Sequence, residues 1–180
     1  MQGNTPIEVT FTDNSNGLPT SWLWDFGDGE TSTEQNPTHT YTQPGIYDVM
    51  LVLNNGISTD TALAINYVSA LPFSGNGNEE SPYTISNLYD LYYLSQLPTI
   101  WDKHFILTAD IQADSTAIAG TVYNNNGLGF SPIGDNPEEP SRQGFAFTGT
   151  FNGQGHTISN LHITHNTNHI GLFGYTLNAN

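Results

Sequence analysis

The sequence predicts a mainly β protein in two parts, a sandwich of two sheets followed by a coil of parallel strands. Three observations lead to this expectation. In the first part, apolar residues alternate with polar ones along several short segments, which is the period of a half-buried strand. Turn residues separate these segments at the spacing of a sandwich. In the second part, short apolar segments lie between Gly and Asn corners, a pattern that suits parallel strands winding round a coil.

The composition is acidic and free of cysteine. The chain has 180 residues, 36% hydrophobic and 12% aromatic, enough apolar material for one large domain or two small ones. Seventeen acidic residues face only Lys103 and Arg142, so the formal net charge is −15. Such a surface repels phosphate backbones and anionic lipids, which argues against nucleic acid and membrane-surface partners. The absence of cysteine excludes disulfides and thiolate metal sites but leaves the redox compartment open.

The N-terminus enters a strand pattern directly after Met1, without a leader pattern. No apolar run approaches the ~20 residues of a membrane span. The chain is therefore either a cytosolic protein or an excised piece of a longer protein, with Met1 as the start of the piece. We favour the second interpretation, because so few Lys and Arg residues suit a secreted, trypsin-resistant surface. We therefore expect a secreted, extracellular or cell-surface location.

The predicted sandwich, residues 1–69, is built from four alternating segments. Gly27 and Gly29 interrupt the second of them, because glycine accepts positive φ. The residues NNG at 54–56 predict a tight turn before the last one. The apolar residues of the four segments are Ile7, Val9 and Phe11; Trp22, Trp24 and Phe26; Tyr47, Val49, Leu51 and Leu53; and Leu63, Ile65 and Tyr67.

These segments also carry a resemblance to a known family. Through VTFTDNS, WLWDFGDGETSTEQNPTHTY and PGIYDVMLVL, residues 6–69 resemble a PKD (polycystic-kidney-disease) domain. The resemblance implies an immunoglobulin-like β-sandwich. It also implies an extracellular spacer or interaction module rather than a catalyst.

The loop WDFGDG holds the candidate metal residues. The short side chains of Asp25 and Asp28 can accept hydrogen bonds from nearby backbone amides, as Asx residues do in turns. Carboxylates on one tight loop also suit calcium, and the resemblance implies a calcium site near this loop that would recruit Asn4 and Asp25. The chain lacks a full D-x-D-x-D ligand run. We therefore favour the turn interpretation and keep calcium as the alternative; no other cofactor is expected.

The strand YDVMLVL predicts an interface. Met50 and Val52 fall at outward positions, where polar residues would be usual in PKD-like strands. An apolar outer patch suggests a contact. We expect the second part of the chain to supply it.

A segment rich in Gly, Ser, Asn and Pro predicts a linker at 70–82, before a second domain at 83–180. The second domain opens with a predicted helix at 87–97, capped by Ser86 or Asn87 and ended by Pro98. Leu88, Leu91 and Leu94 form its apolar face, and Asp90 lies near the positive end of its dipole.

A buried-looking strand is predicted at 103–111, and residues 112–146 predict a long polar excursion. Residues 147–163 place Gly at alternate positions before an apolar strand, and 169–177 predict another strand. FTGTFNGQGHTISNLHI, IGLFGYT, SPIGD and the helix segment resemble the GLUG-repeat family of large bacterial cell-surface proteins, over about residues 83–177. The resemblance implies a right-handed parallel β-helix whose N-terminal helix caps the first coil. Only one repeat is present before Asn180, where family members carry several.

The histidines of the second part invite a zinc hypothesis. His162 and His165 have opposite strand parity, and His156 belongs to a turn pattern. We therefore favour solvated or turn histidines over a zinc site. The four histidines concerned are His156, His162, His165 and His169.

Asp135, Glu138 and Glu139 form an acidic loop beside prolines. A glycosidase needs two acids held rigidly at a defined separation, which such a loop supports poorly. We found no nucleophile–base set and no phosphate-binding glycine loop before a helix.

The last predicted strand has no cover. Ile170, Leu172 and Phe173 would expose apolar core and unpaired backbone groups there, which invites edge pairing. Further coils of a longer protein or another chain must then cover this end. We therefore expect self-association through it.

The function predicted from the sequence is a non-catalytic structural or adhesive segment of a large secreted or cell-surface bacterial protein. The sandwich would be the spacer, and the β-helix a stalk or a surface for proteins or glycans. Two alternatives stay open. The chain could be the front of a secreted polysaccharide- or protein-degrading enzyme with its active site beyond residue 180, or a subunit of an extracellular fibre.

Overall fold

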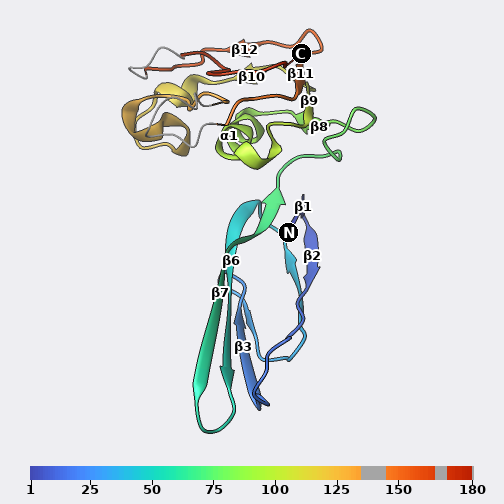
Figure 1. Ribbon diagram of the computed structural model, residues 1–180. Coiled ribbons are helices and arrows are strands. Elements are labelled where there is room, and N and C mark those ends of the chain that lie inside the picture. The colour runs from blue at the N-terminus through green and yellow to red at the C-terminus, as the bar shows by residue number, and fades with distance from the viewer. Residues whose placement is uncertain (135–144, 165–169, 180) are drawn as a thin grey trace. The chain divides into compact units, whose positions relative to one another are not determined.

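The computed structural model describes residues 1–134, 145–164 and 170–179 (Figure 1). The chain divides into two compact units, Met1–Pro72 and Phe73–Asn180. No helix in the described residues is long and apolar enough to cross a membrane.

The first unit is an all-β sandwich with two unequal sheets. One sheet has five strands in the order β1-β7-β6-β3-β4, and the other has only β2 and β5. All neighbours are antiparallel except β1 and β7, which run parallel. The strands are β1 (Gln2–Asn4), β2 (Ile7–Thr10), β3 (Ser21–Asp25), β4 (Thr31–Ser32), β5 (Thr38–Tyr41), β6 (Gly45–Asn54) and β7 (Thr59–Leu71).

Aromatic side chains fill the core between the two sheets. Trp24 and Phe26, which the sequence assigns to the core, are 7% and 2% exposed. Phe11 contacts both rings, at centroid distances of 5.4 and 5.2 Å. Burial of one such side chain is worth about 1.5–3 kcal/mol, so this cluster is the main apolar contribution to the stability of the sandwich. Its buried members are Val9, Phe11, Trp24, Phe26, Tyr41, Val49, Leu51, Val68 and Ala70.

The first part of strand β7 places small residues on the inner face and large ones outside. Ala62 and Ala64 pair with the buried residues Leu51 and Val49 of β6 and share their side of the sheet, where Ala62 is exposed and Ala64 is half-buried. Leu63 and Ile65 of the predicted last strand have the opposite parity and are 59% and 69% exposed. The register between β6 and β7 shifts between Tyr47 and Val49, and beyond the shift Tyr67 contacts the core ring of Phe11. The alternation in the sequence is real, but Leu63 and Ile65 face away from the core.

The second unit contains short parallel strands. β8 (Tyr83–Ile85), β9 (His104–Leu107) and β11 (Thr150–Asn152) form a three-stranded parallel sheet with β9 in the middle. β10 (Ile111–Gln112) pairs in parallel with β12 (Ile158–Ser159).

The strand predicted at 103–111 is wrong as a single element, because it divides into β9 and β10. Between them, the carboxylate of Asp110 accepts the backbone N–H of Thr157 at 2.9 Å. The strand predicted at 169–177 is reduced, in its described part, to single parallel bridges at Phe173 and Thr176.

The predicted helix is present as α1 (Leu88–Gln96). Asn87 is its N-cap and accepts the backbone N–H of Asp90 at 3.0 Å. Asp90 reaches back to the backbone N–H of Ser86 at 2.8 Å, so the two side chains satisfy donors at the helix start reciprocally. Leu91 and Leu94 are fully buried.

The predicted linker 70–82 contributes to both units. Leu71 ends β7, and Phe73 is 3% exposed. The backbone N–H of His104 bonds the carbonyl of Gly77 at 3.0 Å, so the later residues of this segment pack with the second unit.

Three short 3₁₀ segments lie between α1 and residue 134, where the first described range ends. The buried side chain of Asn124 holds two of them together by donating to the carbonyl of Thr116 at 2.7 Å. The segments are Pro98–Ile100, Asp114–Ala117 and Val122–Gly127.

Asp13 organises the loop between β2 and β3, a role the sequence analysis missed. Its carboxylate accepts the indole N–H of Trp22 at 2.7 Å, the backbone N–H of Ser15 at 2.9 Å and the amide of Gln35 at 3.3 Å. The hydroxyl of Ser15 donates to it as well. These bonds, first those from Ser15 and Trp22, lower the pKa of Asp13 to about 2.

We expect Asp13→Asn to lower the free energy of unfolding by about 1 kcal/mol at pH 7, a value reduced for solvent screening. The folded-state pKa lies below the ordinary value of 3.8, so this stabilisation is present above that value and is lost as the pH falls toward 2. Urea denaturation from pH 7 down to pH ~2.5 should therefore show the difference shrinking with acid. The exposed Glu8→Gln is the control, and a difference that does not depend on pH would contradict the assignment.

Candidate functional site

The loop that follows β3 is held by its own aspartates. The carboxylate of Asp25 accepts the backbone N–H of Gly27 at 2.9 Å, and that of Asp28 accepts the N–H of Glu30 at 3.1 Å. Both are Asx turns, as the favoured interpretation of the sequence predicts. Gly27 has φ +81°, and a Cβ there would lie 2.3 Å from the carbonyl oxygen of Asp48, so the position requires glycine.

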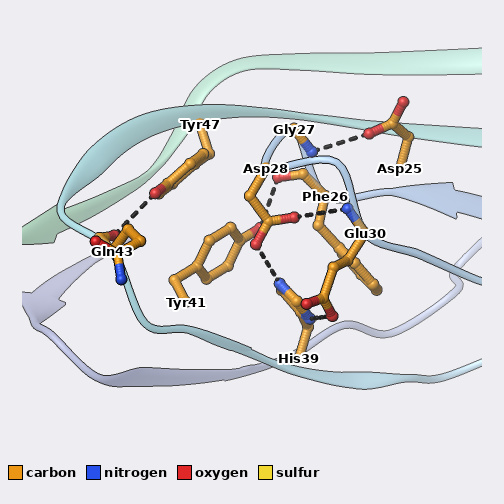
Figure 2. A network of polar contacts seen from close by, with 9 residues as sticks. All are labelled: Asp25, Phe26, Gly27, Asp28, Glu30, His39, Tyr41, Gln43 and Tyr47. Carbon is orange, nitrogen blue, oxygen red and sulfur yellow. Dashed lines mark hydrogen bonds and ion pairs between the residues drawn. The ribbon is translucent and has the colours of Figure 1, made fainter.

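His39 enters the core beneath this loop (Figure 2). It is 7% exposed and stacks on Phe26 with ring centroids 4.1 Å apart and an interplanar angle of 3°. Its Nε2 lies 2.7 Å from the Asp28 carboxylate, and its Nδ1 lies 3.8 Å from that of Glu30. Asp28 therefore both closes the turn and pairs the buried ring.

Tyr41, two residues further along β5, is the second polar group in this core. Its side chain has no exposed surface, and its hydroxyl donates to the carbonyl of Phe26 at 3.0 Å. Burial, and to a smaller degree the charge of Asp28, raises the pKa of this phenol above its ordinary value of 10. It stays a neutral donor and packs against Tyr47, with centroids 4.6 Å apart.

This arrangement is a structural corner, in which polar side chains hold the loop against the core. Both oxygens of Asp28 already accept a hydrogen bond, one from the backbone N–H of Glu30 and the other from the imidazole of His39, and the buried phenol of Tyr41 stays protonated near neutral pH. The sequence analysis missed both His39 and Tyr41. The sequence does contain a signal for them. In THTY, His39 and Tyr41 alternate with two threonines and therefore share one face of a strand.

The calcium hypothesis concerns Asn4, Asp25 and Asp28. Asn4 lies in β1, paired with Leu71, whereas Asp25 ends β3, paired with Met50. The second carboxylate oxygen of Asp28 would have to exchange His39 for the cation. In the described part of the chain, no group of three or more His, Asp or Glu side chains is placed to hold a metal. Calcium binding at these residues stays a prediction.

His156 and His162, the two zinc candidates within the described residues, make different contacts. The ring of His156 lies 3.3 Å from the carboxylate of Asp110, and its backbone N–H bonds Gly153 in a turn. The pKa of Asp110 is lowered, first by the backbone N–H of Thr157 and then by His156. His162 is an exposed side chain whose backbone N–H bonds Thr116.

Several residues singled out in the sequence lie outside the described residues. They are His165, His169, Asp135, Glu138 and Glu139.

The proposed interface residues of the sandwich lie where the sequence places them. Met50 pairs with Leu63, and Val52 pairs with Leu23 and Thr61, all on the outer face of the five-stranded sheet. Met50 and Val52 are half-buried. That this patch contacts the second part of the chain stays a prediction.

The described residues near the end of the second unit form backbone hydrogen bonds with Ile133. The backbone of Leu172 accepts the N–H of Ile133 at 2.9 Å, and the N–H of Gly174 bonds the carbonyl of Ile133 at 2.8 Å. Phe173 is half-buried and packs on Phe147 at 4.9 Å. Ile170 is 60% exposed.

We expect Asp28→Ala to lower the free energy of unfolding by about 2 kcal/mol, because it leaves the buried ring N–H of His39 without its acceptor and opens the turn. Glu30→Ala is the control. Its carboxylate is 76% exposed and 3.8 Å from the ring, so its loss should cost about 0.5 kcal/mol or less. Urea denaturation of both variants decides. Equal losses would contradict a specific role for the Asp28–His39 pair.

A calcium site at Asp25 and Asp28 predicts that calcium raises the melting temperature more than magnesium does, because a cation that binds the native state stabilises it. Asp25→Asn should abolish the difference. Equal small shifts from both ions would indicate charge screening by an acidic surface and refute the site.

Comparison with known proteins bears on both units. Residues 2–70 match the family model of the PKD domain. Halomucin of Haloquadratum walsbyi is 41% identical over 103 residues, which are 57% of this chain and 1% of halomucin. Collagenase ColA of Bacillus cereus is 52% identical over 44 residues, or 24% of this chain and 5% of the collagenase. Microbial collagenase of Vibrio alginolyticus is 41% identical over 86 residues, or 45% of this chain and 10% of that protein.

The chain thus spans a tenth or less of the length of each of these relatives. The first unit, Met1–Pro72, holds less than half of the 180 residues. The match to halomucin covers 57% of the chain and therefore extends into the second unit. The predicted PKD domain is confirmed: the sandwich over residues 2–70 of this chain is a PKD domain.

Proposed function

We propose that this chain is a non-catalytic structural segment of a large secreted or cell-surface protein. The PKD domain acts as a spacer. The second unit is a coil of a GLUG-type, right-handed parallel β-helix, which serves as a stalk or an adhesive surface.

The parallel pairing of the second unit supports the β-helix. Strands far apart in the sequence stack in register, with Phe151 beside Phe105 and Phe105 beside Tyr83. Short parallel strands in register, joined by Gly and Asn corners, are what stacked coils require. An aromatic column runs from β8 and β9 to the isolated bridges at Phe147 and Phe173, with centroid distances of 4.9–6.1 Å. Its members are Tyr83, Phe105, Phe147 and Phe173.

The observation that carries the proposal is an apolar layer at the end of this stack that is only half-buried in the described part of the chain. Among the described residues after Gly149, none is buried. We call the half-buried apolar side chains there the terminal layer: Phe151, Ile158, Leu161, Leu172 and Phe173. Earlier layers are closed, since Ile85, Leu91 and Phe105 are fully buried. An apolar layer with one free face is what a coil needs if another coil is to stack on it.

A non-catalytic role is supported by the chemistry of the corner at Asp28, whose polar groups are paired with one another. The relatives point the same way, because each shares only a short part of its length with this chain.

A second candidate is an accessory segment of a large protease. Relatives named collagenase, and a pre-pro-metalloprotease PrtV of Vibrio cholerae that is 40% identical over 55 residues, favour it. In that case the catalytic residues lie outside this chain, and the role of the two units is the same.

We expect residues 1–180 to associate with increasing concentration through the terminal layer, because association buries its apolar face. Leu172→Lys places a charge at the edge of this layer and should shift association to concentrations about tenfold higher or more. Sedimentation velocity over a concentration series measures the shift.

The matched control is Val122→Lys, an exposed apolar residue of the same unit outside the terminal layer, at 62% exposure. Thermal melting of both variants verifies that the fold is intact. A wild-type chain that stays monomeric at millimolar concentration, or equal effects of the two lysines, would refute association through the terminal layer.

A further inference from the structure

The PKD domain has one sheet edge that the described residues leave unpaired. The five-stranded sheet faces a partner of only two strands, β2 and β5. β2 pairs with β5 on one side, and no described strand pairs with it on the other. Such an edge presents a row of unused backbone donors and acceptors.

The register shows which backbone groups are free. Ile7, Val9 and Phe11 lie opposite Tyr41, His39 and Pro37, and the N–H of Phe11 donates to the carbonyl of Pro37 at 2.9 Å. In an antiparallel pair the bonded positions alternate. The N–H and C=O groups of Glu8 and Thr10 therefore point away from β5, toward the free edge.

A slot of about 230 Å³ opens beside this edge, at the end of β2. Its lining is mainly apolar and comes from the inner faces of both sheets, with Phe11, Trp24, Leu51, Ala62, Ala64 and Tyr67 among its residues. The rings of Phe11 and Tyr67 are 6.1 Å apart, which places the end of β2 beside β7. The small side chains of Ala62 and Ala64 leave room above β7, where a third strand of the smaller sheet would lie.

We propose that an extended segment of a different protein adds to β2 as a third strand. Its backbone pairs with Glu8 and Thr10, and its inward apolar side chain enters the slot. Hydrogen bonds to the unpaired backbone groups of an edge strand give such a complex its affinity, and a pocket for every second side chain gives it specificity. Neither feature alone would identify the occupant. Together they require a strand with apolar residues at every second position.

Charge decides which chain can supply this strand. Glu8 lies on the free edge, and the molecule carries a formal charge of −15, so a basic segment is attracted and an acidic one is repelled. This chain has only two basic residues, Lys103 and Arg142. A second copy therefore lacks a complementary strand, and the partner is another protein with a basic, alternating segment.

The test uses the full chain and a synthetic peptide, acetyl-KVTVKVTV-amide, whose valines share one face and whose lysines share the other. Binding should slow hydrogen exchange at the amides of Glu8 and Thr10, whereas the amide of Val9 is already bonded to β5. Versions with glutamate in place of lysine, or with N-methyl groups on the valines, should bind at least about tenfold more weakly.

Ala62→Leu fills the slot without removing a core contact and should weaken binding by about tenfold or more. Thr61→Leu adds the same bulk on the outer face of β7 and is the matched control; it should bind as the unchanged chain does. Melting temperatures verify that both variants are folded. Absence of binding by the lysine peptide, absence of protection at Glu8 and Thr10, or equal binding by the two variants would overturn the proposal. None of these results bears on the terminal layer of the second unit.

Discussion

The sandwich depends on how two polar side chains are accommodated in an apolar core. Ladder hydrogen bonds run only within a sheet, so the contact between sheets rests on side chains. His39 and Tyr41 both come from β5 of the smaller sheet, and both find their partners in the loop after β3 of the larger one. A buried donor without an acceptor costs about 1–3 kcal/mol. The loop at Asp25–Glu30 must therefore take the one conformation that presents the carboxylate of Asp28 and the carbonyl of Phe26. The glycine at 27, the two Asx turns and the stacked Phe26 ring follow from that requirement.

The second unit solves a different problem with parallel strands. In the stack that we propose, each strand uses one edge to pair with the preceding layer, and the terminal layer is only half-buried among the described residues. At the other end, α1 contributes Leu91 and Leu94 as fully buried side chains. The two ends of the unit are therefore unequal in what they bury. This difference between the two ends supports the stacking of further coils on the terminal layer alone. It agrees with the proposal that the chain is a segment of a larger protein.

Both proposed surfaces arise from the same physical rule. A strand at the edge of a sheet keeps half of its backbone groups unsatisfied, and native proteins cover, charge or use such edges. In the PKD domain the edge of β2 is short, carries Glu8 and lies beside an open slot. In the second unit the edge lies beside the half-buried ring of Phe173. The first suits a strand of complementary charge, whereas the second suits another coil of the same kind.

Local pattern in the sequence determined the elements whose signal is contained within one segment. The alternation in WLWDF and YDVMLVL identifies buried residues such as Trp24 and Val49, and Asn87 with Pro98 bounds α1 closely. The aspartates of the loop were assigned correctly to turns, because an Asx turn involves residues only two apart. The signature motifs of the first unit identified its family, since the turn, the glycines and the inward residues occur together in one continuous stretch.

What depended on pairing between distant segments was decided only by the tertiary structure. Asp13 became a hub because Trp22 and Gln35 converge on it from other parts of the chain. The segment 103–111 divided into two strands because its first part pairs with β8 and β11, whereas its last part pairs with β12, far along the sequence. The parity of β7 was set by its register with β6, which put Ala62 and Ala64 on the side of Leu51 and Val49 and Leu63 on the outer side. The sequence thus determined which residues prefer strands, turns and burial, whereas the three-dimensional fold decided which partner each of them meets. Hydrogen bonds and packing act across space, and no single segment contains both members of such a pair.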